Sequence, residues 1–255
     1  MVLCFVVALV GCGGESSETT RSRRSTTSTS TSTTTTSTST TPRRSAADDL
    51  AAYFDAARAT DERLTIAARL VNAGIGPDEL RFDQATVDAI SAAEPKVAAA
   101  AIPAGLEPDL LRAVMLVQND LASRHAALVR IEVGTFPAGE YQAQYVLTCL
   151  GNGSGAKARF TTDLAAAEAA AASAPPVVVA PADSRAAAEV AIRLQDIAIQ
   201  NLGCDSCGGA VPPELAPITW QQEPGEPPWD GRIGDLQFRA RYTAENVWEV
   251  QLNAC

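Results

Sequence analysis

The chain has 255 residues, and 46% of them are hydrophobic, which is enough to build one substantial core. Its formal net charge is −10, and because residues 13–45 carry a net +3, the remaining 46–255 carry −13. Such an acidic folded part argues against nucleic-acid binding, since phosphate backbones are bound by basic surfaces. A single histidine excludes metal sites built from several histidines.

The first residues form an apolar run that ends at a cysteine. Residues 2–10 are almost entirely apolar, and Leu9-Val10-Gly11 lead directly into Cys12, where a polar sequence begins. The run is too short to span a bilayer, but it has the length of the apolar region of a signal peptide. No basic residue precedes it, so we expect the natural start codon to lie upstream or the sequence to be a fragment.

The motif Leu9-Val10-Gly11-Cys12 resembles the lipobox of bacterial lipoproteins. The resemblance implies that residues 1–12 are a lipoprotein signal peptide, with cleavage before Cys12 and acylation of its thiol. It implies a mature protein that is exported and anchored by lipid to the bacterial cell membrane, facing away from the cytoplasm. The alternative is an ordinary exported protein that is cleaved near Gly13.

Residues 13–45 are dominated by serine and threonine. Such a composition cannot bury enough apolar surface to offset the entropy of ordering, so this segment is predicted to be a disordered tether. A flexible chain of this length has a reach of roughly 30 Å. We expect it to hold the following domain away from the membrane.

Residues 46–203 predict a helical part. A first helix begins after Ser45, where Ser45 and Asp48 resemble a capping box, and its apolar residues recur every three or four positions until Gly74. A second helix is predicted to open at Pro77 and to end at Pro95. The third is predicted to open at Pro108, with Leu110, Val114, Val117, Leu121, His125 and Leu128 along one side.

Two further helices are predicted from alanine content and apolar spacing, over residues 156–172 and from Asp183 or Ser184 to Gly203. Residues 140–150 fit either a strand or a helix, and the helical neighbours favour a helix. Residues 151–155 read as a turn, although their glycines could also cradle an anion before a helix.

Residues 204–255 predict a proline-rich loop followed by a β-hairpin. The strands are expected at Leu236–Thr243 and Asn246–Asn253, with a possible third at Ile218–Gln221. The predicted fold class is therefore α+β, a mainly α-helical bundle with a small C-terminal antiparallel β-sheet, stapled by disulfides. We expect residues 46–255 to form a single globular domain.

Four cysteines follow the lipobox, and an even number in an exported chain indicates two disulfides. Cys149 is expected to pair with Cys204 or Cys207, and Cys255 with the other. Two alternatives stay open: a thiol redox pair at Cys204 and Cys207, and a zinc site of four cysteines.

The strongest candidate for a contact surface is the stiff loop of residues 220–230. Proline-rich loops that carry aromatic residues suit recognition, because little entropy is lost on binding. The alternatives are that the tryptophans pack under the sheet, or that two of the acids act on a glycoside. His125 is expected to be a satisfied core or rim residue. The loop candidates are Trp220, Glu223, Glu226, Trp229 and Asp230.

These patterns favour a non-enzymatic lipoprotein of the cell envelope whose tethered domain binds a partner, either another envelope protein or an exported ligand. No cofactor is expected, and the membrane is expected to be contacted through the lipid. The alternative functions are an exported thiol oxidoreductase that uses Cys204 and Cys207, a carboxylate-based hydrolase, and a structural spacer without a ligand.

Overall fold

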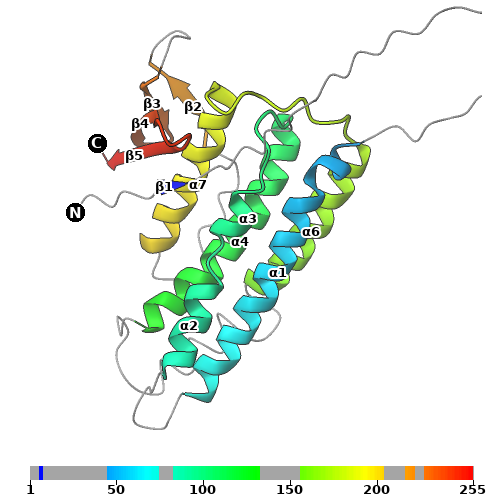
Figure 1. Ribbon diagram of the computed structural model, residues 1–255, viewed down its shortest axis with the longest axis vertical. Helices are drawn as coiled ribbons and strands as arrows, with labels where there is room; N and C mark the ends of the chain where they lie inside the picture. Colours follow the sequence, from blue (N-terminus) through cyan, green and yellow to red (C-terminus); the bar gives the residue numbers. More distant parts are fainter. Residues whose placement is uncertain are drawn as a thin grey trace, which may run out of the picture.

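The computed structural model combines a bundle of helices with a small antiparallel sheet, which is the α+β class predicted (Figure 1). It describes residues 6–7, 45–74, 83–132, 156–203, 216–221 and 227–254. The helices in these ranges are α1 (Ala46–Ala73), α2 (Gln84–Ala92), α3 (Lys96–Ala99), α4 (Pro108–Glu132), α6 (Ala156–Ser173) and α7 (Arg185–Gly203).

Helices α1, α4 and α6 pack closely along their lengths, and α6 runs antiparallel to α1 (Figure 1). The amide of Ala46 at the start of α1 donates to the carbonyl of Ala174, just after the end of α6, at 3.3 Å. Many fully buried positions here are alanines, such as Ala57 and Ala167. Their short side chains let the helix backbones approach each other, as the alanine-rich, aromatic-poor composition indicates.

Two of the predicted helix starts are confirmed. The amide of Ser45 donates to the Asp48 carboxylate at 2.8 Å, the reciprocal bond of a capping box. At the start of α7, the Ser184 hydroxyl accepts from the amide of Ala187 at 3.3 Å.

The second helix differs from its prediction. Helix α2 begins at Gln84 rather than at Pro77, because Asp83 has an extended backbone and its carboxylate accepts from the amide of Thr86 at 2.8 Å. Asp83 is thus an N-cap, and a helix from Pro77 cannot run through it. After α2 the chain turns at Pro95 into the single turn of α3.

The strands form one antiparallel sheet in the order β1-β5-β4-β3-β2. The hairpin of β4 and β5 agrees with the prediction, and β2 confirms the possible third strand. The two-residue β1 lies beside the outer edge of β5. The strands are β1 (Val6–Val7), β2 (Ile218–Trp220), β3 (Trp229–Ile233), β4 (Leu236–Tyr242) and β5 (Trp248–Ala254).

Strand β3 was not predicted, because Asp230-Gly231 reads as part of a loop. Gly231 lies opposite Phe238 in the sheet. A Cβ atom at Gly231 would come within 2.4 Å of the Phe238 ring and of the Thr219 carbonyl oxygen. The glycine therefore belongs inside the strand, where neighbouring atoms occupy the place of its side chain.

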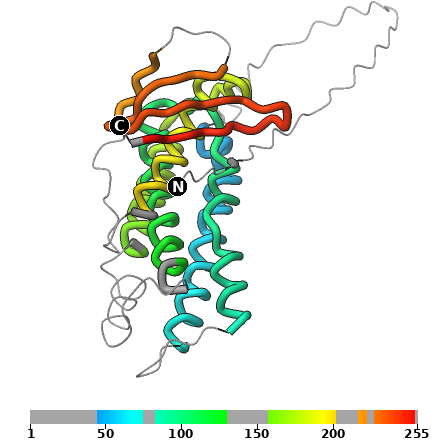
Figure 2. Tube along the Cα trace, turned by 90° about the vertical axis from the view of Figure 1, so that its left-hand side faces the viewer, coloured from blue at the N-terminus to red at the C-terminus, as the bar shows by residue number. Residues whose placement is uncertain are grey.

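The sheet packs on α7 with its strands running across the helix axes (Figures 1 and 2). Two hydrophobic clusters meet at this helix. Val190, Leu194 and Ile197 join the bundle core, whereas Ala191 and Ile192 join the cluster under the sheet. Helix α7 is therefore shared by both halves of the fold.

Several predictions fall outside the described residues. These are the tether, the ambiguous segment at 140–150 and the turn at 151–155. Among the helices that the structure describes, none has both the length and the apolar character required to cross a membrane.

Candidate functional site

The residues of the predicted contact loop lie in different environments in the structure. Trp229 is only 5% exposed, and its ring stacks on Trp248 with 5.3 Å between centroids. Trp220 is half-buried and meets Trp229 edge-on at 5.8 Å. Both tryptophans thus pack in the sheet, the alternative that the sequence left open, while Glu223 and Glu226 lie outside the described residues.

The third acid of that loop, Asp230, lies on β3. Its carboxylate pairs with Arg239 on the neighbouring strand, with 3.6 Å between Oδ1 and Nε. Asp230 therefore takes part in a surface ion pair between β3 and β4. The five cysteines named above, Cys12, Cys149, Cys204, Cys207 and Cys255, all lie outside the described residues, so the lipid site and the disulfides stay predictions.

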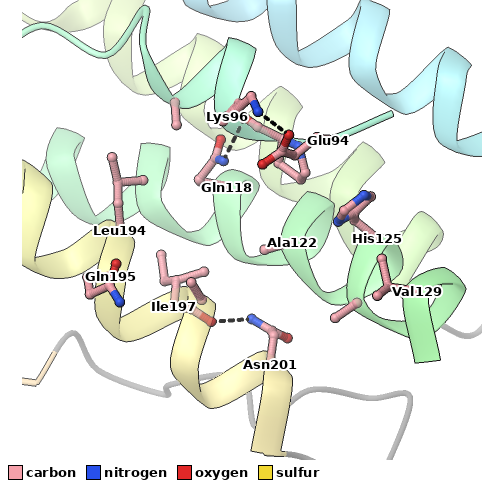
Figure 3. Close-up of a pocket in the computed structure, with 14 residues that line it drawn as sticks. Glu94, Lys96, Gln118, Ala122, His125, Val129, Leu194, Gln195, Ile197 and Asn201 are labelled. Carbon is pink, nitrogen blue, oxygen red and sulfur yellow. Dashed lines mark hydrogen bonds and ion pairs between the residues drawn. The ribbon is translucent and has the colours of Figure 1, made fainter. Parts of the chain in front are cut away.

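A pocket of about 220 Å³ lies between α4, α7 and the corner formed by the end of α2 and α3 (Figure 3). Its α4 wall presents Gln118, Ala122, His125 and Val129, which share one helix face at spacings of four, three and four residues. Across from them α7 contributes Leu194, Gln195, Ile197, Ala198 and Asn201.

The pocket exists because small residues line it where two helices face each other. Ala122 and Ala126 on α4, Ala198 on α7 and Ala99 on α3 all end at Cβ. No longer side chain from these positions fills the space, and the rest of the wall is largely apolar. The site is therefore suited to an apolar group rather than to a highly charged one.

Gln118 is the exceptional polar group of this wall. Its side chain is 3% exposed, and its Nε2 donates to the carbonyl oxygen of Pro95 at 3.1 Å. Because a carbonyl only accepts, this bond fixes the amide orientation and makes the other atom Oε1. Oε1 is almost completely covered by surrounding atoms, and it has no hydrogen-bond partner among the described residues.

Three other polar residues of the lining, Asn201, Glu94 and Lys96, have partners. Asn201 donates through Nδ2 to Asn119 Oδ1 at 3.0 Å and to the Ile197 carbonyl at 2.8 Å. Glu94 and Lys96 form an ion pair at the mouth (Figure 3). The charges of this ion pair at the rim therefore largely cancel.

His125 is half-buried on the same wall, and its Nε2 lies 3.2 Å from the Ile90 carbonyl oxygen. Burial lowers the pKa of His125, so the ring is neutral at pH 7. Since the carbonyl accepts, Nε2 carries the hydrogen and Nδ1 is left as an acceptor. This is the satisfied rim histidine that the sequence predicted.

A second polar cluster lies inside the bundle, away from the pocket. Asp120 on α4 is 1% exposed, and Arg159 Nε on α6 donates to its Oδ1 at 3.1 Å. Burial raises the pKa of Asp120 to about 7, with Asp163 adding to the rise and Arg159 opposing it. Burial also raises the pKa of nearby Tyr53, whose hydroxyl donates to the Val114 carbonyl.

We expect Asp120 to make the stability of the protein pH-dependent. Because its pKa is higher in the folded state than the usual 3.8, its stabilising contribution is complete below about pH 4 and is lost as the pH rises through about 7. Asp120→Asn resembles the protonated form, so it should reduce the difference in unfolding free energy between pH 4 and pH 8 by up to about 4 kcal/mol. Urea unfolding at several pH values from 4 to 8 measures this difference.

The exposed Asp109 on the same helix provides the control. Asp109→Asn should leave the slope of stability against pH as in the wild type. A wild-type stability that is constant from pH 4 to pH 8 would contradict the assignment to Asp120.

Sequence reasoning did not single out Gln118, Asn201 or Asp120. A signal was present, because Gln118-Asn119-Asp120 is a polar run between the buried residues Val117 and Leu121 on a helix predicted to be apolar along one side. Within the described residues, no three His, Cys, Asp or Glu side chains gather closely enough to hold a metal ion. The chain matches no known protein-family model, no curated protein and no solved structure.

Proposed function

We propose that the protein is a lipid-anchored protein of the bacterial cell envelope whose tethered helical domain binds a small, mainly apolar ligand. The binding site is the α3–α4–α7 pocket. The observation that carries the proposal is a pocket of about 220 Å³ whose lining is formed mostly by alanine and aliphatic side chains.

The energetics favour an occupant over an empty pocket. An apolar occupant gains free energy when it leaves water for the apolar walls of the pocket. Each methylene that leaves water adds about 0.8 kcal/mol. The pocket walls offer such burial, because alanine and aliphatic side chains form most of the lining.

The anchor and the tether set where this binding would occur. The lipobox-like motif at Cys12 and the segment of residues 13–45 support a domain that is exported and held near the outer face of the membrane. There it could take up an exported ligand directly. A neighbouring envelope protein is the other partner that this location allows.

The pocket can be tested by filling it. Ala122 lies at the centre of the α4 wall (Figure 3), and Ala122→Leu would project a larger side chain into the cavity. We expect at least tenfold weaker binding of the neutral apolar dye N-phenyl-1-naphthylamine, followed by its fluorescence. The matched control is Ala166→Leu at an exposed position of α6, which should bind as the wild type does.

Two results would contradict this proposal. One is a dye that does not bind the folded wild-type protein, and the other is equal binding by the wild type and Ala122→Leu. Circular dichroism of each variant shows whether the helices are intact, so that a folding defect is not mistaken for a filled pocket.

The anchor has its own test. The mature protein from bacterial membranes should begin at Cys12 and carry the mass of a diacylglyceryl group, measured by mass spectrometry of its N-terminal peptide. Two acyl chains give stable attachment where one is marginal. Cys12→Ser should therefore move most of the protein out of the membrane fraction. An unmodified Cys12 thiol in the mature protein would end the anchor proposal.

A further inference from the structure

The predicted signal peptide contributes a strand to one edge of the sheet. Strand β1 consists of Val6 and Val7, which lie in the apolar run before Cys12. It pairs antiparallel with β5, so that Val7 lies opposite Trp248 and Val6 opposite Glu249 (Figure 1). Cleavage before Cys12 removes both valines. In the processed protein, β5 is then the last strand on that side of the described sheet.

Alternate residues of β5 turn their backbone groups away from β4. In an antiparallel pair, only every second residue exchanges hydrogen bonds with the residue opposite it. The amide of Thr243 donates to the Val247 carbonyl at 2.9 Å, and this bond sets the alternation along the hairpin. Trp248, Val250 and Leu252 therefore present N–H and C=O groups at the outer edge, where β1 pairs with the first of them.

The two edges of the sheet differ in their protection against pairing. Exposed edges are normally blunted by short length, proline, lysine or bulges. Strand β2 has 3 residues and directly follows Pro217. Strand β5 has 7 residues without proline or lysine, and its single charge, on Glu249, pairs with Arg241 on β4. The β5 edge therefore has the features of a strand that pairs with another segment.

A single extended segment fits this edge better than a second copy of the chain does. Two copies paired antiparallel at β5 are related by a two-fold axis across the sheet, so their helices lie on the same face of the combined sheet. The helices extend well beyond β5 on the side away from β4, so the helices of two copies would collide (Figures 1 and 2). One added strand needs only the place that β1 takes.

We infer that the processed protein binds an extended, mainly apolar segment of a neighbouring envelope protein, which pairs antiparallel with β5 in the place of β1. This inference rests on the proposed function, because the edge opens only if the chain is cleaved before Cys12. Backbone hydrogen bonds supply the affinity and the strand direction. One face of the added strand continues the side of the sheet on which Trp248 and Val250 are buried, which favours apolar residues at alternate positions.

The signal peptide itself is the probe. A fluorescein-labelled peptide of residues 1–11, with Cys4→Ser and two lysines added for solubility, is titrated against the processed protein of residues 12–255 carrying Cys12→Ser. We expect saturable binding in fluorescence anisotropy. The full chain, whose own β1 occupies the edge, should bind the peptide at least about tenfold more weakly, because the two strands compete for one site.

Two proline variants of the peptide test the register. Val7 exchanges backbone hydrogen bonds with Trp248, whereas the amide of Val6 points away from β5. Val7→Pro should therefore weaken binding about tenfold, and Val6→Pro should stay within about threefold of the unaltered peptide.

Hydrogen exchange measured by nuclear magnetic resonance locates the peptide on the protein. The amides of Val250 and Leu252 should exchange more slowly when the peptide is bound, because they face the outer edge. The amide of Gln251 faces β4 and is the internal control, since its exchange should not change.

The outcomes separate this inference from the proposed function. A processed protein that does not bind the peptide, or that binds both proline variants equally, would overturn the inference while leaving the anchor and the pocket in place. A dimer in sedimentation velocity that the peptide dissociates would assign the edge to a second copy instead. If mass spectrometry shows residues 1–11 still attached in the membrane-bound protein, the anchor proposal fails and the inference fails with it.

Discussion

Trp248→Ala is expected to lower the free energy of unfolding by about 3–5 kcal/mol. Trp248 is 1% exposed, the largest of the fully buried side chains of the described structure. Its ring stacks on Trp229 and contacts Tyr242 with 5.2 Å between centroids, and its Nε1 donates to the Ala182 carbonyl at 2.8 Å. Truncation removes these contacts together and leaves a cavity between the sheet and α7.

Two related variants are expected to destabilise the protein less than Trp248→Ala does. Trp248→Phe keeps most of the ring but loses the bond to Ala182, which should cost about 1–2 kcal/mol. Trp220→Ala, at a half-buried position, should cost less than Trp248→Ala. Urea unfolding followed by far-ultraviolet circular dichroism measures all three. A Trp248→Ala protein within 1 kcal/mol of the wild type would mean that the sheet does not depend on α7.

Asp61→Leu is the second change with a large expected effect, about 3–5 kcal/mol of lost stability. Asp61 on α1 pairs with Arg124 on α4, whose side chain is 1% exposed and also donates to the Thr65 hydroxyl at 3.2 Å. Without the carboxylate, the guanidinium stays buried among the helices, and no other carboxylate of the described residues pairs with it. The cost is that of an uncompensated buried ion.

The partner variant should be less damaging. Arg124→Met leaves behind Asp61, whose side chain is 24% exposed and can be hydrated. In the double variant both charges are gone. Its loss of unfolding free energy should therefore be at least about 1 kcal/mol smaller than the sum of the losses in the two single variants. Asp55→Leu, at an exposed position on α1, is the control and should stay within about 0.5 kcal/mol of the wild type. Strict additivity of Asp61→Leu and Arg124→Met would refute the coupling.

The long helices could be predicted closely, because their signals are local. Apolar residues repeat with the helical period, and Ser45, Gly74 and Ser184 mark ends that the structure has at the same places. The start of α2 was harder to place, since both Pro77 and Asp83 are plausible first residues of a helix. The extended backbone of Asp83 makes it the N-cap of α2, and the sequence alone does not show that backbone conformation.

The strand β3 and the pocket depend on contacts between distant segments. Gly231 lies within a strand because Phe238 and Thr219 approach it closely, whereas in sequence a glycine after an aspartate indicates a turn. Similarly, Ala122 and Ala198 resemble the many other alanines of the chain until α4 and α7 face each other. A cavity forms where side chains from facing segments leave space between them, so no local sequence pattern predicts it.

The place of α7 between the two cores has a consequence for how this protein can be observed. Leu194 and Ile197 on this helix line the pocket, and Ile192 faces the tryptophan cluster under the sheet. The chain has 3 tryptophans, Trp220, Trp229 and Trp248, and all of them belong to or pack against that cluster. A ligand that shifts α7 therefore changes the surroundings of every indole in the molecule, and intrinsic tryptophan emission becomes a spectroscopic reporter of an event on the other side of the helix.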